Sequence, residues 1–290
     1  MRSVDLHVHT TCSDGTDTPA QVVQKAGKLG LAAIAITDHD TTAGVVEAKV
    51  AGAEAGIRVV SGIEISTEYE GREVHLLGYL LDPDSPSLKP VLEWTVNDRN
   101  SRNEKMVALL QKDGYHISME QLRAEHPGTV IGRPHMAEAL LQAGEVESIQ
   151  DAFDRLLGEG KPYCLPRTYM PFPRAAEVIC SAGGVPVLAH PLQYGYDDAG
   201  LEKLVKTAAD CGAVGIEVYY SGYEEEQRRK LMNLGDRYGL IYTGGSDYHG
   251  ARKPHIQLGT GMGQLQVPEN VLDALDEAHR KAHAEQFAET

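Results

Sequence analysis

The chain has 290 residues, of which 27 are basic and 42 acidic, and its formal net charge is -15. This acidic balance argues against a general polyanion-binding surface, so any affinity for phosphate must be local. The four cysteines are widely spaced and form no Cys-x-x-Cys pair, which argues against a disulfide framework or a zinc ribbon. No apolar run approaches the roughly 20 residues of a membrane span, and no apolar leader is visible, so we expect a cytoplasmic protein without membrane contact.

The first part of the chain alternates between strand and helix patterns. Thr18 and Pro19 predict a helix start, because Thr is a good N-cap and Pro suits the first helical position, and Gly30 ends that helix. Apolar runs and alternating patterns predict the elements that follow. These are a strand over residues 31–37, a helix over 44–56, and strands over 58–65 and 73–81.

The regular alternation stops at a turn-rich stretch, residues 82–86. The chain then shows helical spacing over residues 88–112, 119–125, 134–143 and 149–156, and a loop containing Gly and Pro follows. We therefore expect an inserted helical cap. The predicted domains are a barrel made of residues 1–84 and 166–290, and a cap made of residues 85–165.

The alternation resumes in the last third of the chain. The predicted helices cover residues 174–181, 201–211, 224–238 and 269–284, and the predicted strands cover 185–189, 214–220 and 240–244. This order indicates an α/β fold of the (β/α) barrel type. Barrel enzymes place their active sites at the C-terminal ends of the strands, so polar residues at those ends are the candidates for function.

Histidines and carboxylates gather at these strand ends. His7 and His9 are two residues apart and therefore point to the same side of a strand, and Asp247 and His249 repeat this spacing. Imidazole together with carboxylate suits manganese, iron or zinc better than calcium. Each residue alone is more simply interpreted as a capping Asp or a core His, but together they indicate a multinuclear metal site. The full set is His7, His9, Asp14, His39, Glu64, His75, His190, Asp247 and His249.

These motifs resemble those of the polymerase and histidinol phosphatase (PHP) family of metal-dependent phosphoesterases. The resemblance runs from Asp5 to His249 and leaves the helical insert outside it. It implies a distorted, seven-stranded TIM-like barrel, (β/α)7, with three divalent metal ions, manganese being expected and iron or zinc being alternatives. It also implies which residues hold each ion: His7, His9, Glu64 and Asp247 the first; Glu64, His75 and His190 the second; Asp14, His39 and His249 the third.

Within the family, the insert and the segments 99–103 and 132–135 resemble the 3',5'-nucleotide bisphosphate phosphatases and relatives described as 5'-to-3' exoribonucleases. The resemblance implies an enzyme that hydrolyses the 3'-phosphate of nucleoside 3',5'-bisphosphates and releases nucleoside 5'-monophosphate. Stepwise cleavage of short RNA and hydrolysis of histidinol phosphate are enzyme alternatives, and a metal-binding regulatory module is the alternative without turnover. We expect a small nucleotide or short RNA as the partner, and no stable protein partner.

The mechanistic hypothesis is that a hydroxide bridging two ions attacks phosphorus in line, because metal-bound water can have a pKa of about 7. Asp247 and His190 are the candidate catalytic proton carriers. The insert supplies candidates for substrate binding, because arginine binds phosphate bidentately. For Arg99 and Arg102 a solvated helix face is an equally good interpretation. The candidates are Arg99, Arg102, Asn103, Arg133 and His135.

Two further pairs of residues are candidates for a supporting role at this site. Asp38 and Asp40 flank His39, and we expect them to accept hydrogen bonds that orient the metal ligands. Lys161 and Arg167 lie in the loop that returns to the barrel and could reach the mouth of the pocket, although a solvated position is the better interpretation for both.

Overall fold

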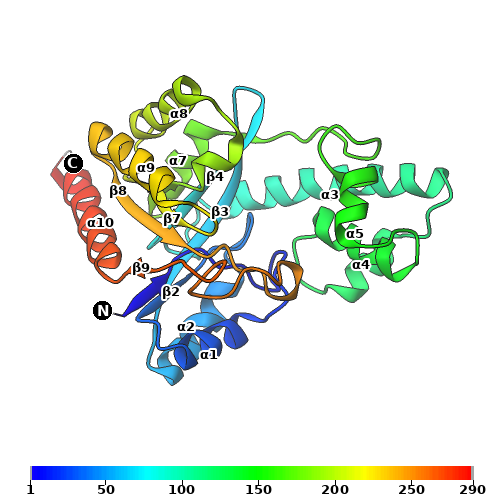
Figure 1. The fold of residues 1–290 in the computed structure, drawn as a ribbon, viewed down its shortest axis with the longest axis horizontal. Helices are drawn as coiled ribbons and strands as arrows, with labels where there is room; N and C mark the ends of the chain where they lie inside the picture. The colour runs from blue at the N-terminus through cyan, green and yellow to red at the C-terminus, as the bar shows by residue number, and fades with distance from the viewer. Residues whose placement is uncertain (1, 289–290) are drawn as a thin grey trace.

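The computed structural model describes residues 2–288, whose strands form one sheet that curls into a nearly closed barrel (Figure 1). The strands are β1 (Ser3–Asp5), β2 (Ala33–Ile36), β3 (Arg58–Tyr69), β4 (Arg72–Tyr79), β5 (Met170–Pro171), β6 (Val185–Leu188), β7 (Gly215–Tyr220), β8 (Ile241–Gly245) and β9 (Val267–Pro268). Their order is β8-β7-β6-β4-β3-β2-β1-β9, with β5 beside β3. The Leu6 amide donates to the Gly244 carbonyl at 3.1 Å, so the β1 and β8 sides of the barrel meet. The predicted α/β barrel is confirmed.

Strand β4 makes the barrel irregular, because it runs antiparallel to both of its neighbours, β3 and β6. The expectation that every candidate metal residue follows the C-terminal end of a strand is therefore wrong for two of them. Glu64 lies in the middle of β3, which continues beyond the rim of the barrel, and His75 lies in the first half of β4. The reversed direction of β4 brings His75 to the same rim as the others.

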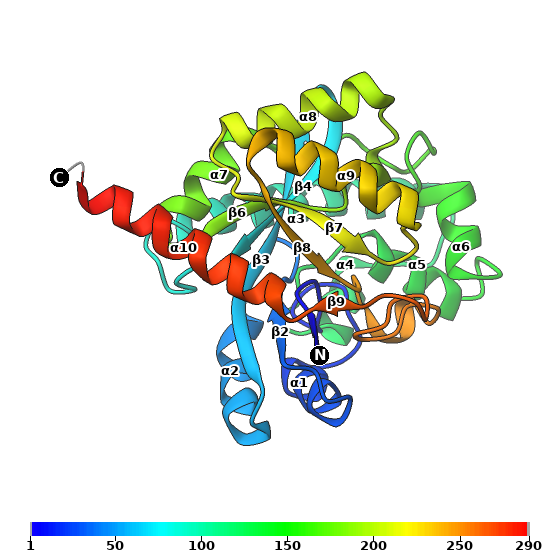
Figure 2. The same cartoon turned by 60° about the vertical axis from the view of Figure 1, so that its left-hand side comes forward.

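Helices cover the outer surface of the barrel. They are α1 (Pro19–Lys28), α2 (Gly44–Ala55), α7 (Phe172–Ser181), α8 (Asp198–Asp210), α9 (Glu225–Tyr238) and α10 (Asn270–Ala288). Figure 2 shows α1 and α2 on one side of the sheet and α7, α8 and α9 on the other. The predicted start of α1 is confirmed: Thr18 and Gln21 form a reciprocal capping box, and Pro19 occupies the first turn. Within residues 2–288, no helix has both the length and the apolar character to cross a membrane.

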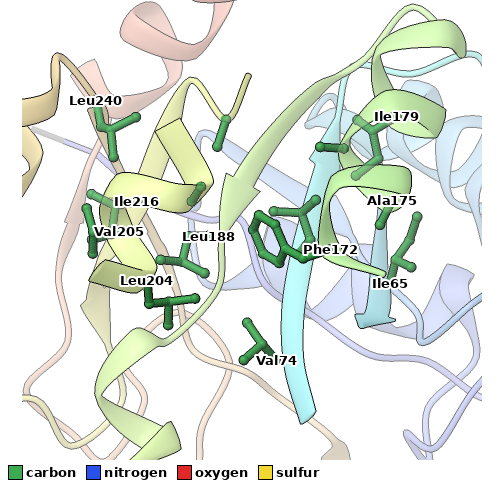
Figure 3. Packing of buried hydrophobic residues seen from close by; sticks show 14 of the residues in the cluster. Ile65, Val74, Phe172, Ala175, Ile179, Leu188, Leu204, Val205, Ile216 and Leu240 are labelled. Carbon is green, nitrogen blue, oxygen red and sulfur yellow. The ribbon is translucent and has the colours of Figure 1, made fainter. Parts of the chain in front are cut away.

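The largest part of the barrel core lies between the sheet and helices α7 to α9 (Figure 3). Ile65 and Val74 come from the β3–β4 hairpin, Leu188 from β6, and Phe172 from the start of α7; Phe172 is only 1% exposed. Burial of a large apolar side chain of this kind contributes about 1.5–3 kcal/mol. This packing fixes the strand ends on which the polar residues of the rim are placed.

The helical insert lies to one side of the barrel, on the right in Figure 1. It contains α3 (Lys89–Lys112), α4 (Met119–Glu125), α5 (Arg133–Gln142), α6 (Ile149–Ala152) and a π-helical turn η1 (Phe153–Leu157), so the helix predicted over 149–156 is divided in two. Met106, Leu110, Leu140 and Leu157 belong to a hydrophobic cluster formed within the insert and its return loop. A separate cap over residues 85–165 stays a prediction, which this cluster supports.

Candidate metal centre and its pockets

Imidazoles and carboxylates from distant parts of the chain meet at one rim of the barrel. In four overlapping groups, ligand atoms lie within 4.8 Å of one another. The groups are His9, Asp14, His39 and His249; His7, Glu64 and His190; His7, His9 and Asp247; and His39, Glu64 and His75. All nine residues predicted to bind metal are therefore present in one connected cluster, which we call the metal centre. Their individual roles as ligands stay predictions.

Glu64 lies in the middle of the metal centre. Its Oε1 atom is 2.9 Å from His75 Nδ1 and 2.9 Å from His190 Nε2. Its Oε2 atom is 3.0 Å from His39 Nδ1 and 3.3 Å from His9 Nε2. Burial acts to raise the pKa of Glu64, but the surrounding imidazoles outweigh it and hold the pKa well below its usual range. The carboxylate is thus charged, and its two oxygens face different imidazoles, as expected of a ligand shared between two ions.

The imidazoles provide a direct test of whether divalent ions fit the centre. His7 Nε2, His9 Nδ1 and His190 Nδ1 are buried without a hydrogen-bond partner. A buried polar atom left unpaired costs about 1–3 kcal/mol, and coordination of an ion would satisfy it. Nitrogen donors combined with carboxylate oxygens suit manganese, iron and zinc. The residues therefore fit divalent transition-metal ions.

The electrostatics of the centre favour positive charge. Burial acts to lower the pKa of His75, but Glu64 outweighs it and raises the pKa to about 10. Burial likewise opposes protonation of His9, yet Asp247 and Glu64 raise its pKa to about 9. The buried carboxylates thus attract positive charge, which bound cations would supply in place of protons on the imidazoles.

Glu217 supports two of the histidines and was missed in the sequence. It lies fully buried on β7, with Oε1 3.0 Å from His7 Nδ1, and its Oε2 accepts a hydrogen bond from the His190 amide at 2.8 Å. His190 itself has a φ of 22°, which a side-chain-bearing residue rarely adopts. A carboxylate on the second nitrogen of a metal-binding histidine fixes its tautomer and orientation. The signal available in the sequence was Glu217 itself, the single charged residue within an otherwise apolar strand.

Asp247 is held by two residues that the sequence analysis also missed. Its Oδ1 atom faces the centre, 3.3 Å from His9 Nε2. Its Oδ2 atom accepts hydrogen bonds from the Tyr220 hydroxyl at 2.7 Å and from Lys253 Nζ at 2.8 Å. The two donors occupy one oxygen, so the other oxygen is directed to the imidazoles. Lys253 lies only four residues after His249, but no spacing rule identifies a lysine at that position as part of the site.

Asp38 accepts hydrogen bonds within the loop that carries a candidate metal ligand. It accepts hydrogen bonds from the Thr10 amide and hydroxyl, both at 2.7 Å, and from the Ser13 hydroxyl at 2.6 Å. These bonds shape the loop that carries Asp14. Within residues 2–288, neither Asp38 nor Asp40 forms a hydrogen bond with an imidazole, so they do not orient ligand rings directly.

A pocket of about 340 Å³ opens from the metal centre toward the insert, and we call it the arginine pocket. It is lined by Arg99, Arg102, Asn103, Arg133 and Arg167, together with His39, His75 and His190 from the centre. Four of the five predicted substrate-binding residues thus lie there. His135 does not: its Nδ1 accepts a hydrogen bond from the Gly132 amide at 3.0 Å and caps α5. Burial lowers the pKa of His135 to about 3, so the ring is neutral.

Three of the four guanidinium groups of this pocket lie beside two carboxylates, and the fourth, that of Arg102, donates to the Leu165 carbonyl at 2.7 Å. Asp40 accepts from Arg99 and, at 2.9 Å, from Arg167. Glu73 lies 3.7 Å from Arg167 and 3.9 Å from Arg133. Arg167, for which the sequence favoured a solvated position, is therefore fixed in the wall of the pocket, whereas Lys161 does not line it. A bound phosphate would meet arginines that are already in place, which reduces the entropy cost of binding.

The comparisons with known proteins agree with this geometry. Residues 5–179 match the PHP domain. The chain is 35% identical over 248 residues to a 5'-3' exoribonuclease of Haemophilus influenzae, covering 86% of this chain and 90% of that relative. It is 33% identical over 250 residues to a 3',5'-nucleoside bisphosphate phosphatase of Chromobacterium violaceum, covering 86% and 88%.

A solved structure extends the comparison to the whole fold. The crystal structure of a metal-dependent phosphoesterase from Bifidobacterium adolescentis superposes with a TM-score of 0.84 at 34% sequence identity, and the match covers 96% of both chains. The matched domain spans more than half of the chain, and the relatives exceed 30% identity over most of it. The chain belongs to the PHP domain family of metal-dependent phosphoesterases.

Proposed function

We propose that the protein hydrolyses the 3'-phosphate of nucleoside 3',5'-bisphosphates, yielding nucleoside 5'-monophosphate and phosphate, with three divalent ions, preferably Mn²⁺, at the metal centre. The observation that carries this proposal is the arginine pocket beside the centre. A substrate with two phosphates can place one at the centre and the other among the arginines. The phosphatase relative from Chromobacterium violaceum supports the same substrate class.

The bound ions would activate water and neutralise charge on the phosphoryl group. The chain's own residues position the reactants. Arg102 and Arg133 bind the distal phosphate, and Tyr220 and Lys253 keep one oxygen of Asp247 directed toward the centre. Asp247 and His190 remain the candidate proton carriers. Burial lowers the pKa of His190, so its ring is neutral near pH 7, as a metal ligand requires.

Exonucleolytic cleavage of short RNA is the second candidate, favoured by the exoribonuclease relative from Haemophilus influenzae. Histidinol phosphatase and a regulatory module have no observation in their favour. The cytoplasmic location and the absence of a stable protein partner stay predictions.

A substrate panel with Mn²⁺ tests the proposal. It compares adenosine 3',5'-bisphosphate, adenosine 3'-monophosphate, histidinol phosphate and an aryl phosphate. We expect the highest kcat/KM for the bisphosphate, and a rate no higher than that for the aryl phosphate would refute the assignment. Arg102→Ala should raise KM for the bisphosphate by roughly tenfold or more, because a hydrogen bond to a charged group is worth about 1.5–3 kcal/mol. Arg123→Ala, at an exposed ion pair of α4, is the matched control.

A further inference from the structure

Two histidines of the last helix meet one backbone carbonyl at the end of the barrel opposite the metal centre. His279 and His283 lie on α10, and the Nε2 atom of each is 2.8 Å from the carbonyl oxygen of Gly183, in the turn between α7 and β6. Strand β6 leads from this turn to His190, so at about 3.3 Å per residue Gly183 lies roughly 20 Å from the metal centre. We call the two imidazoles and this carbonyl the α10 histidine site.

The spacing of the two histidines places them on one face of the helix. Residues at i and i+4 are neighbours on a helix surface, and the centroids of the two rings are 4.4 Å apart. Two histidines at this spacing on a helix can bind one zinc ion together. Both side chains are partly buried, so their nitrogens are held in place and can still be reached from solvent.

The distances between the three polar atoms are close to those within a coordination sphere. Zinc binds imidazole nitrogen at about 2.0–2.1 Å and oxygen at about 2.0–2.2 Å, so two of its ligand atoms lie roughly 3.0–3.4 Å apart. Each nitrogen is 2.8 Å from the carbonyl oxygen, so an opening of roughly 0.5 Å would admit an ion. Hydrogen bonds account for the same distances only if both imidazoles carry their proton on Nε2, because a carbonyl cannot donate.

The carbonyl of Gly183 is suited to a cation. Helix α7 ends at Ser181, and Gly183 follows its C-cap residue, Ala182, with a φ of 77°. The C-terminal end of a helix carries a partial negative charge, which favours a cation beside it. Within residues 2–288 no backbone amide donates to this oxygen. The oxygen therefore adds a third ligand of favourable charge to the two nitrogens.

The α10 histidine site lies where apolar packing of the helix becomes sparse. Val271, Leu272 and Leu275, in the first turns of α10, belong to a buried cluster of the barrel. Residues 279–284 are at most partly buried, and Figure 2 shows the later turns of α10 extending outward, away from the sheet. The two histidines thus attach the later turns to the barrel through polar contacts.

We propose that the α10 histidine site binds a divalent transition-metal ion of the zinc class through His279 Nε2, His283 Nε2 and the Gly183 carbonyl. Imidazole nitrogen suits zinc, copper and nickel, and water would complete the coordination. The ion connects the end of α10 to the turn before β6, so its role is structural. The site is separate from the metal centre and does not depend on the substrate that the centre hydrolyses.

Zinc binding by the full-length protein tests the proposal. His279→Gln and His283→Gln keep an N–H that can donate to the Gly183 carbonyl, but each removes a ligand, because an amide nitrogen is not a zinc ligand. His116→Ala, at a histidine of the insert that is 86% exposed, is the matched control. Equilibrium dialysis should give wild type and control one more bound zinc ion per chain than either Gln variant. Loss of a partner of a metal ligand weakens affinity by about 10–100-fold, so loss of the ligand itself should weaken this site at least as much.

Thermal unfolding provides a second readout, because an ion that binds only the folded chain raises Tm. Zinc should raise Tm by roughly 2–4 °C more in wild type and His116→Ala than in the two Gln variants. Mg²⁺ should produce no such difference, because it prefers oxygen ligands. Turnover of the bisphosphate with Mn²⁺ should be the same in all four proteins, since the site lies at the other end of the barrel.

The outcomes separate a metal site from a pair of hydrogen bonds. Equal zinc content in all four proteins, or an equal rise in Tm with zinc, would overturn the proposal and leave the two histidines as hydrogen-bond donors only. If the expected zinc difference is found in a protein that does not hydrolyse the bisphosphate, the α10 histidine site stands and only the proposed function fails.

Discussion

Replacing Asp40 with asparagine should weaken the attachment of the insert to the barrel. The Asp40 carboxylate is fully buried and connects three segments: Arg99 on α3, Arg167 in the return loop, and the Ser66 amide on β3, which donates at 2.9 Å. Asparagine keeps the shape and can still accept from Ser66, but it removes the charge. Two guanidinium groups would then lack their buried counter-charge.

The magnitude follows from the pKa of Asp40. Burial acts to raise this pKa, but the charges of Arg99 and Arg167 outweigh it and lower the pKa from 3.8 to about 2. At about 1.4 kcal/mol for each pKa unit, this lowering means that the charged form contributes about 2–3 kcal/mol to folding. Because the folded-state pKa is the lower one, this stabilisation is present above pH 4 and is lost as the pH falls toward 2.

Urea unfolding of the metal-free protein at pH 7 measures the effect. We expect Asp40→Asn to reduce the free energy of unfolding by about 2–3 kcal/mol. Asp276→Asn is the matched control, because Asp276 pairs with Arg58 at the surface, where the side chains are 30% and 43% exposed. A surface pair of this kind contributes about 0–1 kcal/mol. If the two variants lose the same stability at pH 7, the carboxylate does not stabilise the attachment and the reasoning is refuted.

Three further results are expected. Glu217→Gln should weaken metal affinity by about 10–100-fold, as measured by titrating activity with Mn²⁺, because the tautomer and orientation of His7 are no longer fixed; an unchanged affinity would contradict a supporting role. Tyr220→Phe removes one of the two hydrogen-bond donors to Asp247 and should lower kcat more than it changes KM, because Asp247 is then less firmly directed toward the centre. A change confined to KM would contradict this positioning role of Tyr220. Chelation with EDTA should abolish turnover and lower Tm, both being restored by Mn²⁺, since unneutralised carboxylates are then left buried; a Tm independent of metal would show that ions do not bind the folded centre.

Most helices and strands could be predicted because their signals are local. Thr18 and Pro19 mark the start of α1, and Gly56, with a φ of 66°, ends α2. The direction of β4 was harder to foresee within a barrel pattern. Its cause is nevertheless local: Glu70 and Gly71 both adopt positive φ and form a tight turn, which makes β3 and β4 an antiparallel hairpin.

The candidate ligands could also be predicted, since His7 with His9 and Asp247 with His249 are visible as short motifs. The residues that support them could not. Glu217 acts on a histidine 210 positions away, and such a contact exists only once the sheet has closed, with β8 between β7 and the first strand. Short spacing therefore identifies residues that act as a pair just beyond the end of one strand, whereas supporting contacts depend on the closed fold.

The charges of the arginine pocket indicate which phosphate it prefers. The carboxylates of Asp40 and Glu73 offset two of the four guanidinium charges, which leaves about two positive charges in the arginine pocket. The arginines are Arg99, Arg102, Arg133 and Arg167. A terminal phosphate carries about −1.5 to −2 near pH 7, whereas a phosphate within a chain carries a single charge. The pocket thus matches a terminal 5'-phosphate, which a nucleoside 3',5'-bisphosphate and a 5'-phosphorylated RNA share. Recognition of that terminus would determine where the substrate begins.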